Sequence, residues 1–170
     1  SKISEVDFEN LTFGNVFTDH MLVCDYVDGA WQKPVIEPYA PFMIDPSAKV
    51  FHYGQAIFEG MKAYKDEQDD VWLFRPDENY HRFNKSATRM AMPEVPEDVF
   101  LGGLHRLLEI EKEWVKKGKG NTLYIRPFMI ATGHGVIAAP SQEYRFMIIL
   151  SPARAYYSGE VKVIIAEHYS

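Results

Sequence analysis

The order of apolar patterns along the chain constrains its fold more than any other feature of the sequence. Short stretches of strand-forming residues come first, two longer stretches with helical spacing follow, and further strand-forming stretches come after them. Strands that are grouped before and after helices, and do not alternate with them one by one, are typical of α+β domains. We therefore expect an α+β fold in which two main helices pack on an antiparallel-rich sheet.

Two hairpins are expected in the first half of the sequence. An Asp-Gly pair separates Met21–Tyr26 from strand-forming residues that begin at Trp31, and such a pair tolerates the positive φ angles of a tight hairpin turn. Gly60–Lys65 and Val71–Phe74 flank the acidic run 66–70. We expect this run to be a solvated turn between two further strands.

The two expected helices lie between these hairpins and the later strands. Pro76 opens the first helix, and Pro93 marks its end. Its apolar stripe has helical spacing and consists of Tyr80, Phe83, Ala87 and Met90. Arg82 points away from that stripe. The second helix is expected from about Glu97 to Lys117, with lysines near its C-terminal end that complement the helix dipole.

Three more strand-forming stretches lie in the last third of the chain. Residues 122–132 and 145–150 are rich in β-branched and aromatic side chains, so we expect them to be central strands. Residues 161–166 form another apolar stretch. A single strand cannot stabilise itself, so this stretch either completes the same sheet or opens a second domain, and we favour the second.

Composition and charge exclude several functional classes. A hydrophobic fraction of 46% and a charged fraction of 25% are ordinary for a globular protein of 170 residues. The net charge of −6, without a basic stripe, argues against nucleic acid as a partner. Cys24 is the only cysteine, so a cytoplasmic setting fits best. No apolar run has the length of a membrane span and no cluster has zinc-ligand spacing, so we expect neither membrane nor metal.

Five motifs, in the same order and with similar gaps, resemble the branched-chain aminotransferases, which are enzymes of fold type IV that depend on pyridoxal 5'-phosphate (PLP). They are FGNVFTDHM at 13–21, FHYGQAIFEGMKAY at 51–64, LFRP at 73–76, LYIRP at 123–127, and the run from Ser151-Pro152 to Tyr156-Tyr157. The resemblance covers about residues 13–159. It implies the small N-terminal domain of this fold over residues 1–155, an interdomain linker at 156–160, and the first strand of a C-terminal cofactor domain at 161–170.

The resemblance implies that Arg82 holds the phosphate of PLP. A guanidinium suits this role because it offers a rigid fork of donors and keeps its charge near neutral pH. Without the resemblance, an arginine on the solvated face of a helix would be the better interpretation.

The resemblance also implies a substrate pocket walled by Phe13, Tyr53, Phe58, Tyr124, Arg126 and Tyr156. Ala138 matches a loop position that, like Tyr53, is expected to reach the site of a neighbouring subunit, which implies a homodimer. Tyr124 and Arg126 are two apart on an expected strand, so both should project from the same face. For Phe13 and Phe58 alone, packing in the core would be the default interpretation.

The lysine that forms the Schiff base with PLP is expected beyond residue 170, so no catalytic residue is assigned here. Lys62 lies in a matching motif, but its position differs, and we interpret it as structural or solvated. The implied parent enzyme transfers the amino group of leucine, isoleucine or valine to 2-oxoglutarate, and the chain alone is expected to be inactive. The alternatives are a non-catalytic binding or dimerisation module, or a relative that acts on D-amino acids.

Overall fold

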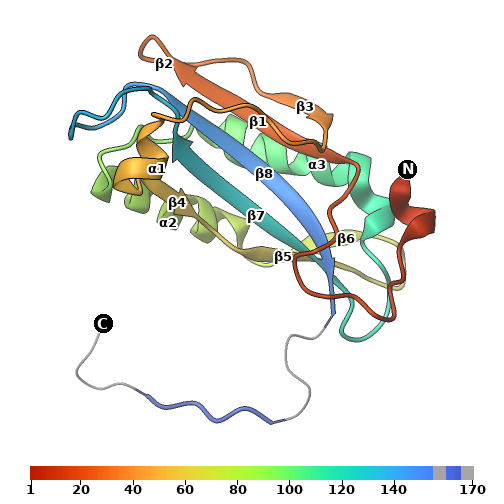
Figure 1. The fold of residues 1–170 in the computed structure, drawn as a ribbon. Helices are drawn as coiled ribbons and strands as arrows, with labels where there is room; N and C mark the ends of the chain where they lie inside the picture. The colour runs from red at the N-terminus through yellow and green to blue at the C-terminus, as the bar shows by residue number, and fades with distance from the viewer. Residues whose placement is uncertain (155–159, 166–170) are drawn as a thin grey trace.

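The computed structural model describes residues 1–154 and 160–165 of the protein. Their strands join into one eight-stranded sheet in the order β2-β1-β8-β7-β5-β6, with β3 beside β1 and β4 beside β7. Every one of these strand pairs is antiparallel. The α+β fold expected from the order of apolar patterns is therefore confirmed (Figure 1).

The elements follow the expected order along the chain. The strands are β1 His20–Val27, β2 Ala30–Trp31, β3 Val35–Pro38, β4 Ala56–Phe58, β5 Met61–Lys65, β6 Val71–Leu73, β7 Thr122–Ala131 and β8 Tyr144–Ala153. The α-helices are α1 Lys49–Tyr53, α2 Pro76–Arg89 and α3 Gly103–Glu111. A π-helical turn, Asp98–Gly102, precedes α3, a 3-10 turn, Lys112–Trp114, follows it, and another 3-10 turn spans Lys2–Glu5.

The first hairpin forms at the expected Asp-Gly turn. Asp28 and Gly29 have φ angles of 54° and 78°, as a tight turn that matches the strand twist requires. The strand expected from Trp31 onward is shorter than predicted. It is broken into β2 and β3, which both pair with β1 on either side of Pro34. Proline has no N–H for the strand ladder, so it interrupts the pairing.

The second hairpin, β5 and β6, also forms as expected, but its acidic turn is more than a solvated connection. The Asp66 carboxylate accepts hydrogen bonds from the backbone amides of Gln68 and Asp70. It also accepts one from the indole of Trp72 at 2.6 Å. One side chain therefore holds both ends of the turn together, because an aspartate can replace backbone groups as the acceptor there.

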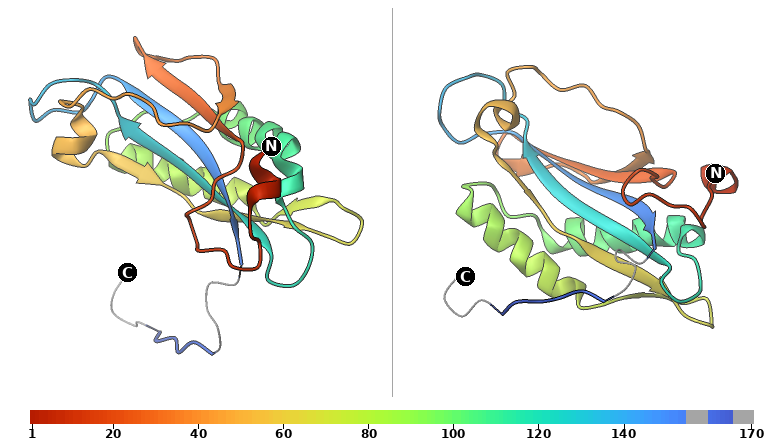
Figure 2. Two further views of the ribbon diagram at one scale, coloured as in Figure 1. Left: turned by 45° about the vertical axis from the view of Figure 1, so that its right-hand side comes forward. Right: turned by 60° about the horizontal axis from the view of Figure 1, so that its bottom comes forward.

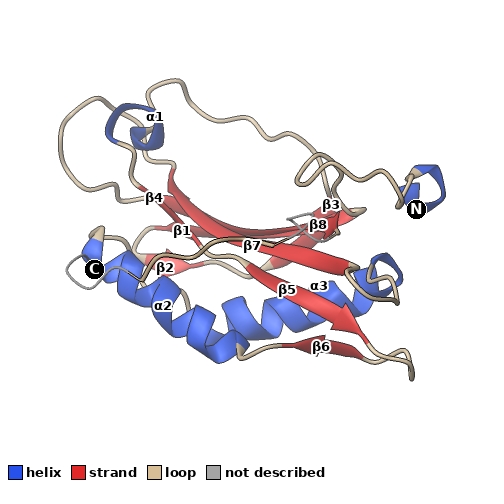
Figure 3. Ribbon diagram, turned by 90° about the horizontal axis from the view of Figure 1, so that it is seen from below, coloured by secondary structure: helices blue, strands red, loops and turns tan. Residues whose placement is uncertain are grey.

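Helices α2 and α3 lie along one face of the sheet, and α1 with its neighbouring loops lies toward the other (Figure 3). Phe83 and Ala87 of α2 are fully buried, as the apolar stripe predicted. The stripe does not extend to Met90, which is 38% exposed because α2 ends at Arg89 and Met90 caps it. The prediction for Met90 was therefore wrong by one helical turn.

The second helical region is less regular and shorter than expected. It runs from the π-helical turn at 98 through α3 to the 3-10 turn that ends at Trp114. Lys117 therefore lies outside the helix and does not complement its dipole. Its ammonium instead forms an ion pair with Asp69 at 2.8 Å and donates to the carbonyl of Glu67. The positive charge consequently stabilises the β5–β6 turn.

One hydrophobic core fills the space between the helices and the sheet. Its largest members include Phe83, Phe100, Leu104 and Phe146, all 0% exposed. Burying one side chain of this size stabilises a fold by about 1.5–3 kcal/mol. The two long strands β7 and β8 lie in the middle of the sheet, as two further views show (Figure 2). They are the central strands that their apolar density predicted.

Side chains along β7 point alternately toward the core and toward the opposite face of the sheet, which is open. Leu123 and Ile125 are 0% exposed and point toward the helices. Tyr124 and Arg126 are half-buried and project from the opposite face. Their expected common direction is confirmed, since side chains two apart on a strand share a face.

Strands β4 and β5 pair with the same edge of β7 and are separated by Glu59 and Gly60. Pro127 of β7 lies opposite this break, and its carbonyl accepts the Glu59 amide at 2.8 Å. Because Pro127 has no N–H, the ladder cannot continue regularly there. A Cβ atom at Gly60 would lie 2.5 Å from the Tyr124 hydroxyl, so a larger residue there would require the Tyr124 side chain to shift.

Residues 160–165 have no helix or strand. Val163, Ile164 and Ile165 are 81%, 91% and 87% exposed. The strand expected at 161–166 therefore has no partner within the part of the chain described, and a strand needs one to form its ladder. Residues 155–159 and 166–170 lie outside the described residues, so the division into 1–155, 156–160 and 161–170 stays a prediction. None of the described helices is long and apolar enough to cross a membrane.

Candidate functional site

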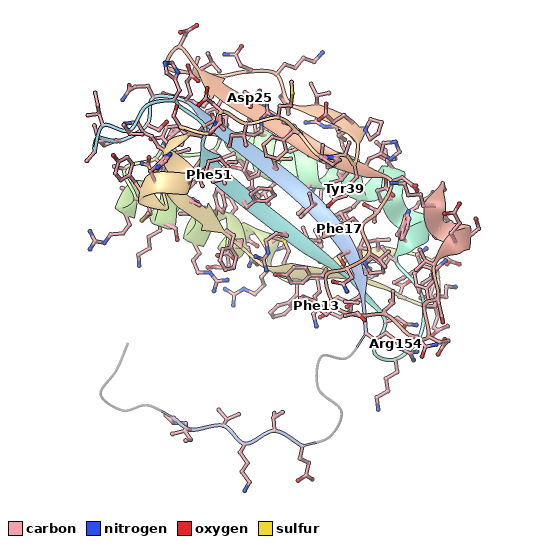
Figure 4. The ribbon with its side chains drawn as sticks, in the orientation of Figure 1. Phe13, Phe17, Asp25, Tyr39, Phe51 and Arg154 are labelled. Carbon is pink, nitrogen blue, oxygen red and sulfur yellow. The ribbon has the colours of Figure 1, made fainter. Side chains whose placement is uncertain are left out.

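A ring-lined cavity of about 220 Å³ lies on the open face of the sheet. It is lined by Phe13, Gly14, Phe17, Tyr124, Arg126, Ile149 and Ser151. The segment before β1 closes one side of this cavity, where Phe13 and Phe17 cross the end of the central strands (Figure 4). The amide of Thr18 donates to the carbonyl of Leu150 at 3.1 Å. This bond ties the segment to β8 directly after Phe17.

Arg126 is the cation of this cavity, and its neighbours are aromatic. Its guanidinium donates two hydrogen bonds to the Tyr124 hydroxyl, from Nη2 at 2.6 Å and Nε at 3.1 Å. It also lies over the Phe58 ring, 4.2 Å from the centroid. Among residues 1–154 and 160–165, no carboxylate pairs with Arg126. A guanidinium has five N–H donors, so several remain for a ligand.

Four of the predicted pocket residues therefore come together in space. Phe13 meets Tyr124 edge-on at 5.0 Å between ring centroids, and Arg126 joins Tyr124 to Phe58. Such edge-to-face ring pairs and cation–π contacts each contribute to stability beyond simple burial. Phe58 is 64% exposed and Phe13 is 42% exposed, so neither is a core residue.

Arg82 lies outside this cavity, on the helical layer. Its Nε and Nη2 bind the two carboxylate oxygens of Glu59 at 2.5 and 2.7 Å. Asn79 donates to the same carboxylate at 2.8 Å. Glu59 is only 5% exposed, whereas the Arg82 side chain is 68% exposed. Burial raises the pKa of Glu59, but the hydrogen bonds from Arg82 and Asn79 outweigh it and hold that pKa below its ordinary value.

The sequence analysis did not single out Glu59. The available signal was an acidic residue between Phe58 and Gly60, inside an apolar motif. A carboxylate at such a position is costly unless a cation pairs with it. Its partner could not be identified from the sequence, because Arg82 follows 23 residues later on a different element.

Two further hollows share Asn79 as a lining residue, one beside Arg82 and one beside Tyr124. Arg82 lines one of about 340 Å³ together with Glu78, Asn79, His81 and Lys85. Asn79 also lines a hollow of about 300 Å³ that reaches Tyr124. Tyr124 in turn borders the ring-lined cavity.

Tyr53 and Ala138 line none of these three hollows. The Tyr53 hydroxyl, on α1, donates to the carbonyl of Val136. Lys49, also on α1 and only 8% exposed, donates from Nζ to the carbonyls of Ile137 and Ala139 at 2.8 Å each. The loop that carries Ala138 is thus held by α1, and Ala138 itself is exposed.

Tyr156 falls outside the described residues, so its predicted place in the pocket stays a prediction. Within the described ranges, no group of histidine, cysteine, aspartate and glutamate side chains could hold a metal ion.

The same fold occurs in solved aminotransferase structures. The branched-chain aminotransferase of Thermoproteus uzoniensis with norvaline aligns with 78% of this chain and 41% of its own, at a TM-score of 0.59 and 19% identity. The enzyme of Thermobaculum terrenum in its PLP form aligns with 83% of this chain and 42% of its own, at a TM-score of 0.57 and 16% identity. The fold is therefore that of the small N-terminal domain of the fold type IV aminotransferases.

The sequence comparison is more specific. Branched-chain-amino-acid transaminase 1 of Bacillus subtilis is 49% identical over 168 residues, which cover 96% of this chain. No protein-family model matches the chain. At such identity, the chain is homologous to the branched-chain aminotransferases over nearly its whole length. It spans about half of that relative, 47% of its length.

Proposed function

We propose that the whole protein that carries these residues transfers the amino group of leucine, isoleucine or valine to 2-oxoglutarate. Its substrates are then an amino acid and a 2-oxo acid. The observation that carries this proposal is the 49% identity to a branched-chain-amino-acid transaminase over 168 residues. None of the lysines in this chain matches the family's cofactor lysine, so the isolated chain is proposed to be inactive.

The cavity supports this choice of substrates. An enzyme of this kind must accept a branched hydrocarbon side chain and also one that ends in a carboxylate. Rings of Phe13, Phe17 and Tyr124 suit the hydrocarbon, and Arg126 at the border suits the carboxylate. Because Arg126 is held by aromatic groups and not by an acid, it remains available to pair with a substrate carboxylate.

PLP is the proposed cofactor, and the residues present fit its phosphate. When bound, PLP acts as an electron sink at the reacting carbon of the substrate. Arg82 and Lys85 bring two cations to the border of one hollow, which Glu78, Asn79 and His81 also line. Glu59 holds Arg82 through Nε and Nη2, so Nη1 makes no bond to that carboxylate and could donate to a phosphate oxygen. The carboxylate thereby orients the guanidinium and leaves part of its donor fork free.

The whole protein is also proposed to be a cytoplasmic homodimer with a second domain. Exposed Tyr53 and Ala138, on α1 and the loop tied to it, are the proposed contacts with the partner's pocket. The exposed apolar side chains at 163–165 support a domain that covers them after a linker at 156–160. Buried, unpaired Cys24 suits a reducing compartment.

The test is an assay of the whole protein with added PLP, leucine and 2-oxoglutarate, with glutamate as the measured product. Glutamate formation with the L-amino acids, and none with D-alanine, is the expected result. Activity with D-alanine alone would indicate the relative that acts on D-amino acids. A dimer without either activity would indicate a binding or dimerisation module.

A further inference from the structure

Ser151 of β8 has a buried hydroxyl that nothing in the described fold explains. The residue is 3% exposed, and within residues 1–154 and 160–165 its Oγ has no hydrogen-bond partner. Other buried hydroxyls in the domain are paired. Ser141 Oγ donates to the Glu143 carbonyl at 2.7 Å, and Thr122 Oγ1 donates to the Ala153 carbonyl at 3.2 Å. A buried hydroxyl without a partner costs stability, so its presence calls for a physical reason.

The position of Ser151 in the sheet supplies that reason. It lies directly across from Tyr124 in the pairing of β7 with β8, and Arg126 lies across from Ile149. Leu150, between Ile149 and Ser151, belongs to the core on the helical side. Because side chains alternate along a strand, Ser151 projects from the open face. It therefore lines the same cavity as Tyr124 and Arg126.

The chemistry of the cavity restricts what the hydroxyl can bind. Apart from Ser151, the side chains that line it are rings, one isoleucine and the Arg126 guanidinium. A ligand group that Arg126 attracts is an anion, and it would also accept a hydrogen bond from a hydroxyl on the neighbouring strand. Diagonal neighbours on adjacent strands lie about 7–8 Å apart at Cα, a separation that one carboxylate between the two side chains can bridge.

We propose that Ser151 is a specificity-determining residue that donates a hydrogen bond to the side-chain carboxylate of the acidic substrate, beside Arg126. This inference rests on the proposed aminotransferase function. A branched hydrocarbon has no acceptor for the hydroxyl, so Ser151 contributes to binding the acidic substrate only. It adds to selectivity because a site with a buried donor favours a ligand that pairs with it.

The experiment compares two unreactive acids as inhibitors of the whole, PLP-loaded aminotransferase. Glutarate carries a second carboxylate, and 4-methylpentanoate carries a branched hydrocarbon in its place. Ser151→Ala is expected to weaken glutarate inhibition about 10-fold, as loss of one charge-assisted hydrogen bond predicts. Inhibition by 4-methylpentanoate is expected to change less than about 2-fold. Ser151→Thr, which keeps a hydroxyl, should retain most of the glutarate affinity.

A second measurement separates binding from a structural role. Since Ser151 donates no bond inside the described fold, Ser151→Ala should leave the thermal midpoint of the apo protein unchanged or raise it. If Ser151→Ala weakened inhibition by glutarate and by 4-methylpentanoate equally, or lowered the thermal midpoint of the apo protein, the proposal would be overturned. Unchanged glutarate inhibition in an enzyme that transaminates leucine normally would also overturn it, and that result would leave the proposed function intact. A wild-type protein without leucine transamination would overturn both.

Discussion

Replacing Arg82 by alanine should destabilise the fold through Glu59. In the wild type, the Glu59 carboxylate is 5% exposed and is held by Arg82 and Asn79. Removing the guanidinium leaves a buried carboxylate with the Asn79 amide and the Gly60 backbone amide as its donors. Breaking a buried ion pair at one side costs more than the pair contributes, because the remaining charge stays desolvated.

The magnitude follows from the exposure of the two partners. Leaving a buried hydrogen-bonding group unsatisfied costs about 1–3 kcal/mol. Because the Arg82 side chain is 68% exposed, solvent weakens the interaction, and we expect about 1–2 kcal/mol at neutral pH. For a domain of this size, that loss lowers the thermal midpoint by about 2–8 °C.

The pH dependence gives the prediction a definite sign. The folded-state pKa of Glu59 lies below its ordinary value of 4.5. Its paired carboxylate therefore contributes stability above that value, and the contribution is lost as the pH falls through the lower, folded-state pKa. In Arg82→Ala, burial then raises the pKa of Glu59 relative to the wild type. The difference in unfolding free energy between the wild type and Arg82→Ala should therefore be largest at about pH 7 and smaller at about pH 3.

The assay is equilibrium urea denaturation at both pH values, with Arg75→Ala as the matched control. Arg75 also forms an ion pair, with Glu78 at 2.9 Å, but these side chains are 64% and 57% exposed. Its loss should cost under about 0.5 kcal/mol. The double variant Glu59→Gln with Arg82→Ala should recover part of the stability. Equal losses for Arg82→Ala and Arg75→Ala, or a loss that does not change with pH, would refute the reasoning.

Three further predictions concern other parts of the molecule. If the whole protein has the proposed aminotransferase activity, Arg126→Leu should lower its specificity for glutamate about 10-fold to 100-fold and affect leucine much less. Single-turnover kinetics of each half-reaction would measure both effects. Equal losses for the two substrates, with unchanged cofactor content, would make Arg126 a scaffold residue. Burial raises the pKa of the Cys24 thiol to about 11, so a thiol reagent should label the native protein far more slowly than the urea-unfolded protein at neutral pH, and comparable rates would contradict the buried position. Burial also raises the pKa of Asp19, but hydrogen bonds from Ser1, the Lys2 amide and Trp114 outweigh it and lower that pKa to about 2. The Asp19 carboxylate therefore stabilises the fold fully above its ordinary pKa of 3.8, and this contribution is lost as the pH falls toward 2. Asp19→Asn should make the unfolding free energy fall less steeply over that pH range. An unchanged slope would count against this account.

Local sequence patterns determined much of the architecture. The Asp28-Gly29 pair specified the first hairpin because both residues tolerate positive φ, and the turn forms there. The two-residue spacing of Tyr124 and Arg126 placed both on one face, since side-chain direction on a strand repeats every two residues. The helical spacing of Phe83 and Ala87 likewise identified the buried side of α2. In each case, neighbouring residues alone decide the outcome.

The tertiary structure decided which of these local elements meet. Arg82 had the pattern of an arginine on a solvated helix face, yet the break between β4 and β5 directs buried Glu59 to it. Ser151 was only part of a matching motif until the register of β7 and β8 placed it across from Tyr124. Both pairings join segments far apart in the chain. They depend on strand register and helix packing across the whole sheet, which no short stretch of sequence specifies.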